Sequence, residues 1–288
     1  MTDLPNLEIQ SHTSELDGQL VYWREGATPD DRCPVLYVHG VPTSSDEWTD
    51  FLQRTGGLAP DLQGFGRTSK RGDLDFSIGG IDHFIERFLD DRAVDRVRLV
   101  VHDWGAAALA FAQRCPQRIE RVVIINAVPL LPGYRWHRIA RIWRTPGLGE
   151  FAMGLTSRWT FKQISREANV TKGPLPDALV RSVASHFDQG TQRAILKLYR
   201  SSDPEVLAAA GANLASITAP ALVVWGKEDP YIAPAFAEAY ATALPNARAR
   251  IVDRAGHWPW LDVPSLIEEI VTFLDEPNPE PEPAPLRP

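Results

Sequence analysis

The chain has 288 residues, of which 44% are hydrophobic and 23% are charged, a composition typical of a globular protein with one sizeable core. Its 30 basic and 37 acidic side chains give a net charge of -7, which would repel a nucleic-acid polyanion. No apolar run approaches the roughly eighteen residues of a membrane span, and the N-terminus lacks a signal-peptide pattern. Cys33 and Cys115 are too few for a disulfide framework. We therefore expect a cytoplasmic protein that binds neither nucleic acid nor membrane.

Short runs rich in Val, Ile and Leu recur along the chain, and nearly continuous apolar runs indicate strands that are covered on both faces. They lie at Gln19–Trp23, Pro34–Val38, Val97–Val101, Val122–Ile125, Ala221–Trp225 and Arg250–Val252. Apolar residues spaced three to four apart predict packing helices at Ile78–Arg92, Trp104–Arg114, Pro234–Ala243 and Pro264–Leu274. This alternation predicts an α/β fold, with a mostly parallel sheet flanked by helices.

The alternation stops after Val128. Residues 129–216 show helical patterns and no convincing strand, so we interpret them as a helical cap inserted between two parts of one core, residues 1–128 and 217–274. The cap helices are expected at Trp136–Trp143, Ala178–Phe187 and Gln192–Leu198. Residues 275–288 carry six prolines and four acidic side chains, which predicts a disordered tail.

Asp103 occupies the most informative position in the sequence. A buried strand ends at Val101 and a helix of small residues begins at Trp104, so Asp103 lies on a sharp turn from strand to helix. Such a turn projects one side chain beyond the carboxyl edge of the sheet, while the following N–H groups point at its reaction zone. This is the geometry of a nucleophile elbow, although an aspartate that only caps a helix would occupy the same place.

Five motifs, in the expected order, resemble those of the α/β-hydrolase superfamily over residues 19 to 274. They are His39-Gly40-Val41-Pro42, Asp61-Leu62-Gln63-Gly64-Phe65-Gly66, His102-Asp103-Trp104-Gly105, Gly226-Lys227-Glu228-Asp229 and Ala255-Gly256-His257-Trp258. Within the superfamily the chain is similar to the branch with an aspartate nucleophile, the epoxide hydrolases and haloalkane dehalogenases. The resemblance implies that Asp103 is the nucleophile, Asp229 the acid and His257 the base.

An aspartate nucleophile restricts the chemistry. A carboxylate is already ionised and can displace a leaving group from saturated carbon, whereas its attack on an ordinary ester would give a high-energy anhydride. We therefore expect an alkyl ester on Asp103, hydrolysed by water that His257 activates and Asp229 assists. The substrate would be a small apolar electrophile, and no metal or organic cofactor is required. Asp253 is a rival acid, and Asn126 stands where some relatives place theirs, but an amide carries no negative charge.

Hydrolysis of the ester also needs donors for the developing oxyanion. The resemblance implies that the backbone N–H groups of Val41 and Trp104 supply them, and we expect Pro42 to shape the loop through a cis peptide bond. We interpret His39 as a brace for this loop through hydrogen bonds.

The leaving group decides between two activities. An epoxide leaves as an alkoxide and needs an O–H donor, for which Tyr199 in Leu198-Tyr199-Arg200 is similar to the tyrosine of the epoxide hydrolases, with Tyr134 or His137 as a second donor. On these residues we expect hydrolysis of small epoxides to vicinal diols.

A halide, the alternative leaving group, needs only N–H donors. Val101 and the segment Pro42-Thr43-Ser44-Ser45 look like dehalogenases, and the indole of Trp104 could pair with another indole from Trp136, Trp143 or Trp159. Val41 lacks the side-chain amide that one dehalogenase group uses. These cap aromatics could equally be packing residues or form a homodimer surface.

A non-catalytic ligand sensor on the same fold is a third, remote interpretation of the sequence.

Overall fold

The computed structural model describes residues 6–29, 31–170 and 175–277. Its sheet has the strand order β1-β2-β4-β3-β5-β6-β7-β8, and β3 to β8 run parallel while β1 and β2 pair antiparallel at one edge. The strands are β1 (Ile9–Leu16), β2 (Gln19–Gly26), β3 (Val35–Val38), β4 (Gly57–Pro60), β5 (Val97–His102), β6 (Ile119–Ile125), β7 (Ala221–Gly226) and β8 (Ala247–Val252). The predicted α/β class is confirmed.

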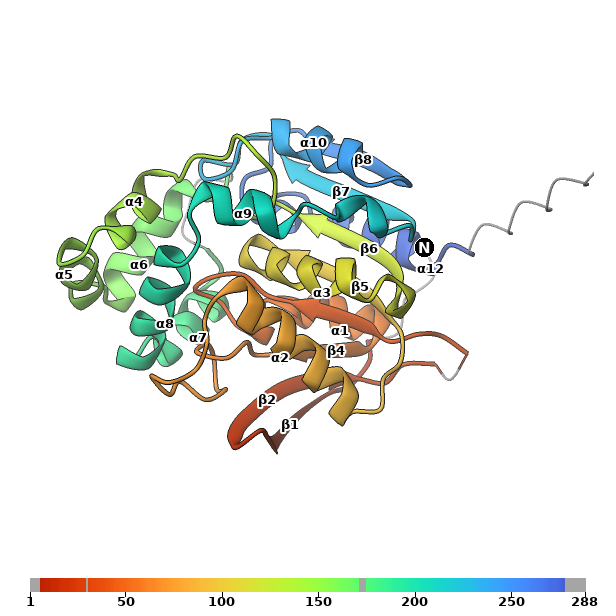
Figure 1. Cartoon of the computed structure of the whole chain (residues 1–288), viewed down its shortest axis with the longest axis horizontal. Helices are drawn as coiled ribbons and strands as arrows, with labels where there is room; N and C mark the ends of the chain where they lie inside the picture. Colours follow the sequence, from red (N-terminus) through yellow and green to blue (C-terminus); the bar gives the residue numbers. More distant parts are fainter. Residues whose placement is uncertain (1–5, 30, 171–174, 278–288) are drawn as a thin grey trace, which may run out of the picture.

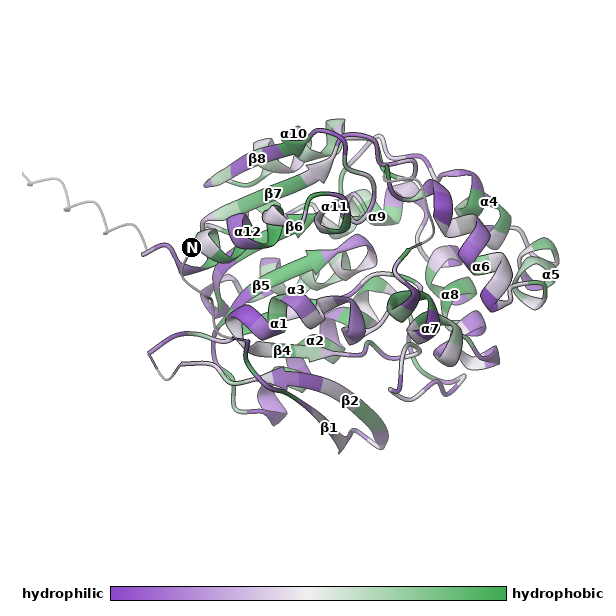
Figure 2. Cartoon of the chain, turned by 180° about the vertical axis from the view of Figure 1, so that it is seen from behind, coloured by the Kyte–Doolittle hydropathy of each residue, from purple (hydrophilic) through white to green (hydrophobic). Residues whose placement is uncertain are grey.

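Helices cover both faces of the sheet, because alternate residues of the central strands are apolar and point to opposite sides. Leu99 and Val101 of β5 belong to one core cluster and Val100 to the other. The first cluster packs under α2 (Ile78–Asp91), α3 (Ala108–Arg114) and α10 (Ala235–Ala243). The second packs under α1 (Thr49–Thr55), α11 (Pro259–Asp262) and α12 (Ser265–Asp275). Figure 2, the view from the opposite side of the molecule, shows these three helices in front of the sheet.

Between β6 and β7 the described chain forms helices and no strand. These are α4 (Arg138–Arg144), α5 (Leu148–Gly154), α6 (Arg158–Ile164), α7 (Asp177–His186), α8 (Gln189–Arg200) and α9 (Pro204–Ala210). Figure 1 shows α4 to α8 gathered beyond one end of the sheet, whereas α9 returns along the core. Among the described residues no helix is long and apolar enough to cross a bilayer.

The predicted tail begins too early. Asp275 is the last residue of α12, and its carboxylate accepts a hydrogen bond of 2.9 Å from Arg98. Arg121 donates to the carbonyl oxygens of Glu276 and Pro277. Ordered chain therefore continues past the predicted boundary, and residues 278–288 lie outside the described part.

Candidate active site

The elbow at Asp103 is built by a strand that ends one residue earlier and a 3-10 helix, η2 (Asp103–Ala107), that begins there. Asp103 has a φ of 48°, a left-handed conformation that is costly for a residue with a side chain. Gly105 allows η2 to touch the sheet, since a Cβ atom on it would lie 2.2 Å from the carbonyl oxygen of Val38. The strain at Asp103 is tolerated because packing on both sides of the turn fixes the backbone.

The loop after β3 and the start of η2 supply the two backbone N–H groups that were predicted as oxyanion donors. The backbone N–H of Val41 donates to Oδ2 of Asp103 over 2.8 Å, and the N–H of Trp104 also lowers the pKa of this carboxyl. The Val41-Pro42 bond is cis. His39 braces the loop, because its Nδ1 contacts the Gly40 carbonyl at 2.7 Å and its Nε2 accepts from the N–H of Leu62 at 2.9 Å.

The three predicted catalytic side chains lie together, all buried. His257 Nδ1 is 2.8 Å from Oδ2 of Asp229, and His257 Nε2 is 3.8 Å from Oδ1 of Asp103. The second oxygen of Asp229 accepts from the N–H groups of Tyr231 and Ile232. An acid positioned by so many donors holds the imidazole in one tautomer and orientation.

The two rivals for the acid have other partners. Asp253 is exposed and pairs with Lys227 at 2.7 Å, away from the site. Asn126 donates its amide to Oδ2 of Asp229 over 2.6 Å and accepts from the N–H of Gly226 over 3.0 Å. Asn126 therefore supports Asp229, a contact that sequence reasoning missed.

The electrostatics of the site follow from burial and from the neighbouring carboxylates. Burial raises the pKa of Asp103. The charges of His257 and His102 and the hydrogen bond from the Val41 N–H lower this pKa, but they do not offset the effect of burial. Burial alone would lower the pKa of His257, but the carboxylates of Asp229 and Asp103 outweigh it and raise the pKa above the usual 6.5. The pKa of Asp229 is lowered because the charge of His257 and the hydrogen bonds from His257, Asn126 and the N–H of Tyr231 outweigh the cost of burial.

Glu47 is a buried carboxylate near His257 that belongs to none of the five sequence motifs. Glu47 accepts from the N–H of Gly40 at 3.0 Å and from the Thr43 hydroxyl at 2.7 Å. Its Oε1 also lies 3.4 Å from Nδ1 of His102, whose Nε2 contacts the carbonyl of His257 at 3.0 Å. Glu47 thus connects the oxyanion loop to the segment that carries the base.

A cavity of about 190 Å³ lies between the core and the cap. Asp103, His257, Val41 and Pro42 line it from the core. The cap side is largely apolar, formed by Ile139, Ile142, Trp143, Ala152, Phe161 and Phe187. A concave apolar site with a few convergent polar groups is typical of small-molecule binding.

The cap residues proposed as leaving-group donors separate into two groups. Tyr199 and His137 line the cavity, and the negative charge of Asp103 adds to burial in raising the pKa of Tyr199. Tyr134 does not line it, and its buried hydroxyl has no hydrogen-bond partner among the described residues. Tyr231 lines the cavity but was not predicted, because its only sequence signal is its place two residues after Asp229.

Two of the predicted indole donors are wrong. Trp136 donates its N–H to the carbonyl of Ser202 over 3.0 Å, and Trp159 is 69% exposed and does not line the cavity. Trp104 stacks on Trp136 and meets Tyr199 edge-on. Its buried N–H lies close enough to the Tyr199 hydroxyl to oppose the rise in that pKa, yet it makes no well-formed hydrogen bond within the described chain.

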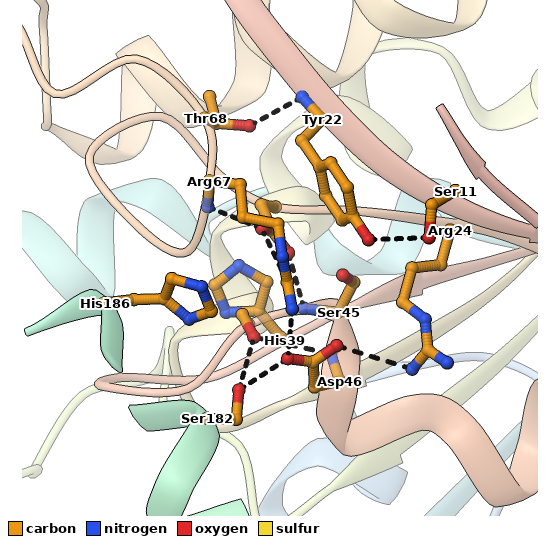
Figure 3. A network of polar contacts seen from close by, with 12 residues as sticks. Ser11, Tyr22, Arg24, His39, Ser45, Asp46, Arg67, Thr68, Ser182 and His186 are labelled. Carbon is orange, nitrogen blue, oxygen red and sulfur yellow. Dashed lines mark hydrogen bonds and ion pairs between the residues drawn. The ribbon is translucent and has the colours of Figure 1, made fainter. Parts of the chain in front are cut away.

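Polar contacts fasten the cap to the core beside the site (Figure 3). Ser182 of α7 donates to Asp46, which also pairs with Arg67 at 2.8 Å. Arg67 in turn reaches Asp61, and Arg24 approaches Asp46 from β2. The described residues contain no cluster of three or more His, Cys, Asp or Glu side chains that could hold a metal ion.

Comparisons with known proteins place the chain among the hydrolases. The model of the Alpha/beta hydrolase family matches residues 35–270. The haloalkane dehalogenase of Bradyrhizobium diazoefficiens is 28% identical over 270 residues, which cover 83% of this chain and 85% of that protein. The haloalkane dehalogenase of Mesorhizobium japonicum is 28% identical over 253 residues, covering 80% and 79%.

A solved structure, that of haloalkane dehalogenase DbeA from Bradyrhizobium elkani, has a TM-score of 0.78 at 25% identity, over 93% of this chain and 98% of that one. The names of these relatives favour the dehalogenase alternative over the epoxide hydrolase that we expected from the sequence. The chain belongs to the α/β-hydrolase family, in the branch that contains the haloalkane dehalogenases and the epoxide hydrolases.

Proposed function

We propose that the protein opens small epoxides to vicinal diols through an ester on Asp103. The observation that carries this proposal is Tyr199, which lines the cavity beside the nucleophile. Burial first, and then the charge of Asp103, keep the pKa of its hydroxyl well above 10, so the group is an O–H donor at neutral pH. An epoxide oxygen needs such a donor because it leaves as an alkoxide.

His137 supports the proposal as the second donor. Its Nδ1 accepts from the N–H of Ala140 at 3.4 Å, which leaves the hydrogen of a neutral ring on Nε2. Burial, aided by the nearby His257, lowers the pKa of His137 to about 4, so the ring is neutral at pH 7. A neutral His137 that lines the cavity can donate a hydrogen bond from Nε2.

The positions of the carboxylate oxygens of Asp103 suggest the course of the reaction. Oδ2 is held by the Val41 N–H, so Oδ1 attacks the ring carbon, the C–O bond breaks, and Tyr199 gives its proton to the alkoxide. Water then loses a proton to His257 Nε2 and attacks the carboxyl carbon of Asp103. The oxyanion on Oδ2 is stabilised by the donors it already has. Its collapse breaks the bond from the carboxyl carbon to Oδ1, the proton of the added hydroxyl passes to the leaving alkoxide, and the diol is released while Asp103 returns to a carboxylate. The proton on His257 returns to Tyr199 through solvent.

The size and lining of the cavity indicate the substrate class. An apolar cavity of about 150 Å³ is known to hold a benzene molecule. A cavity of about 190 Å³ with apolar cap walls therefore suits an epoxide that carries one ring or a short alkyl chain.

Haloalkane dehalogenation is the second candidate. It is supported by the names of the relatives and by the indole N–H of Trp104, which directly follows Asp103 and makes no well-formed hydrogen bond with any described residue. Two features weigh against it. Val41 carries no side-chain amide, and the indole N–H of Trp136 already donates to the carbonyl of Ser202.

Intact-protein mass spectrometry on His257→Gln tests both candidates, because loss of the base should trap the ester. Addition of the whole mass of an aryl epoxide supports epoxide opening. A mass increase equal to that of a bromoalkane minus hydrogen bromide supports dehalogenation. In the same background, Tyr199→Phe should slow adduct formation from the epoxide by about 100-fold or more. The epoxide proposal fails if only the bromoalkane reacts, and the shared mechanism fails if Asp103→Asn still turns over substrate.

A further inference from the structure

The outer end of the cap carries a concentrated apolar surface. Of the six exposed large hydrophobic side chains in the described chain, four lie here: Leu148, Phe151, Leu155 and Trp159, with exposed fractions of 48%, 65%, 59% and 69%. The spacing of the first three places them on one side of α5, and Trp159 follows at the start of α6. We call these four residues the tip patch. Figure 2 shows α5 at the extremity of the molecule.

The tip patch is separated from the cavity by a single layer of helix. Ala152 of α5 and Thr156, two residues after its end, line the cavity, while their neighbours Phe151 and Leu155 are exposed. Phe161 of α6 also lines the cavity. The same two helices therefore have one side toward the substrate space and the other toward solvent.

The surroundings of the tip patch are basic in a protein of net charge -7. Residues 135–167 contain seven basic and two acidic side chains. Arg135, Arg141, Arg158 and Arg166 are exposed and form no salt bridge with any residue in the described ranges. By contrast, Lys162 is paired with Asp177. An excess of uncompensated positive charge thus accompanies the exposed aromatic and aliphatic groups.

We propose that the tip patch and these arginines dock the protein reversibly on an anionic lipid surface. Trp, Phe and Leu side chains beside Arg and Lys are the combination that interfacial helices use, with the apolar groups inserted at the headgroup boundary and the cations at anionic headgroups. A second copy is a poorer occupant, because a two-fold contact would bring two positively charged surfaces together. This inference departs from our expectation that the protein meets no membrane.

Docking would place the cavity next to the lipid, in which apolar substrates accumulate. This consequence rests on the proposed function, whereas the docking proposal itself does not. The cavity wall that faces the tip patch is the apolar one. A substrate dissolved in lipid would then have only the α5–α6 layer to pass.

Vesicle flotation of the full chain tests the proposal without any substrate. We expect binding to phosphatidylcholine vesicles that contain about 30% phosphatidylglycerol, weak binding without the anionic lipid, and release at high salt. Phe151→Ser with Trp159→Ser should reduce binding about 10-fold or more, and Arg141→Gln with Arg158→Gln should remove the preference for anionic lipid. Leu20→Ser with Val206→Ser is the matched control, exposed elsewhere, and should bind like the wild type.

Four results would overturn the proposal: no binding to anionic vesicles, equal binding to neutral ones, unchanged binding of the tip-patch variant, or equal loss in the control. A dimer in solution that Phe151→Ser with Trp159→Ser dissociates would also overturn it, and would assign the patch to a second copy. The tip-patch variant should retain wild-type turnover of a water-soluble substrate. Failure to bind vesicles therefore leaves the proposed function standing, and absence of turnover leaves docking standing.

Discussion

At the scale of single residues, Glu47 acts on the base without touching it. Its charge is one of the causes that raise the pKa of His257, and its own pKa is lowered because His102 and other contacts outweigh the cost of burial. His257 must be neutral to take a proton from water, so ester hydrolysis should rise with pH through the pKa that His257 has in the ester, which Asp229 and Glu47 still raise but the esterified Asp103 does not. Loss of a nearby negative charge should move that rise to lower pH.

We predict that Glu47→Gln shifts the pH profile of ester decay to lower pH and also lowers Tm, because an amide cannot accept at both oxygen positions. Single-turnover decay of the Asp103 ester, followed against pH, is the measurement. Glu47→Asp keeps the charge and should leave the profile near that of the wild type, even if its rate falls. A Glu47→Gln profile that does not move would show that Glu47 is only structural.

The sequence predicted those site residues that stand within local motifs, namely Asp103, Asp229 and His257. Glu47 could not be predicted, because it is 55 positions away from His102 in the sequence and meets it only in the folded chain. Nor could Tyr134 and His137 be ranked as second donors. They lie three residues apart, and which one faces the cavity depends on where α4 begins; His137 is its N-cap.

At the scale of elements, the contact between η2 and the sheet depends on one missing side chain. A methyl group on Gly105 would lie 2.2 Å from the Val38 carbonyl oxygen, so the helix would have to move away from β3. We expect Gly105→Ala to cost about 1–3 kcal/mol and to lower Tm by roughly 3–10 °C. Gly154→Ala, where nothing lies within 4 Å of the added group, is the control and should be neutral or stabilising. Thermal unfolding that ranks the two variants equally would contradict this account.

The predicted elements were most accurate where strands are buried on both faces. Val97–Val101 matches β5 closely, because a continuous apolar run has few other interpretations. β1 was missed because it is an edge strand in which most side chains are at least partly exposed, and β4 because it has only four residues. α5 and α6 were missed for a related reason: with Phe151 and Trp159 exposed, their apolar residues do not mark a buried face.

At the scale of the whole molecule, Asp103, the proposed nucleophile, should reduce the stability of the fold. The pKa of Asp103 is raised in the folded protein, which means that its charged form is disfavoured there relative to the unfolded chain. The penalty is present above the folded pKa and disappears below the unfolded value of 3.8. At neutral pH the folded protein is therefore less stable than the same fold would be with an uncharged side chain at position 103.

We predict that Asp103→Asn abolishes ester formation and raises Tm at pH 7 by about 2–4 °C. The gain over the wild type should shrink as the pH falls toward 4, because the wild-type carboxyl then becomes protonated. Calorimetry of both proteins across this range measures the difference. A gain that is absent at pH 7, or that grows on acidification, would refute the assigned cost of burial.

One hydrogen bond joins the two parts of the molecule at the base itself. The backbone N–H of His257, in the core, donates to the carbonyl of Ala168, in the cap, over 2.7 Å, and Gly256 passes so close that a Cβ there would lie 2.1 Å from the same oxygen. The cap consequently cannot be replaced without regard to the position of its backbone. A chimaera that takes this segment from another hydrolase must therefore keep the main chain at position 168 in the same place, because a shift there would release the backbone of His257.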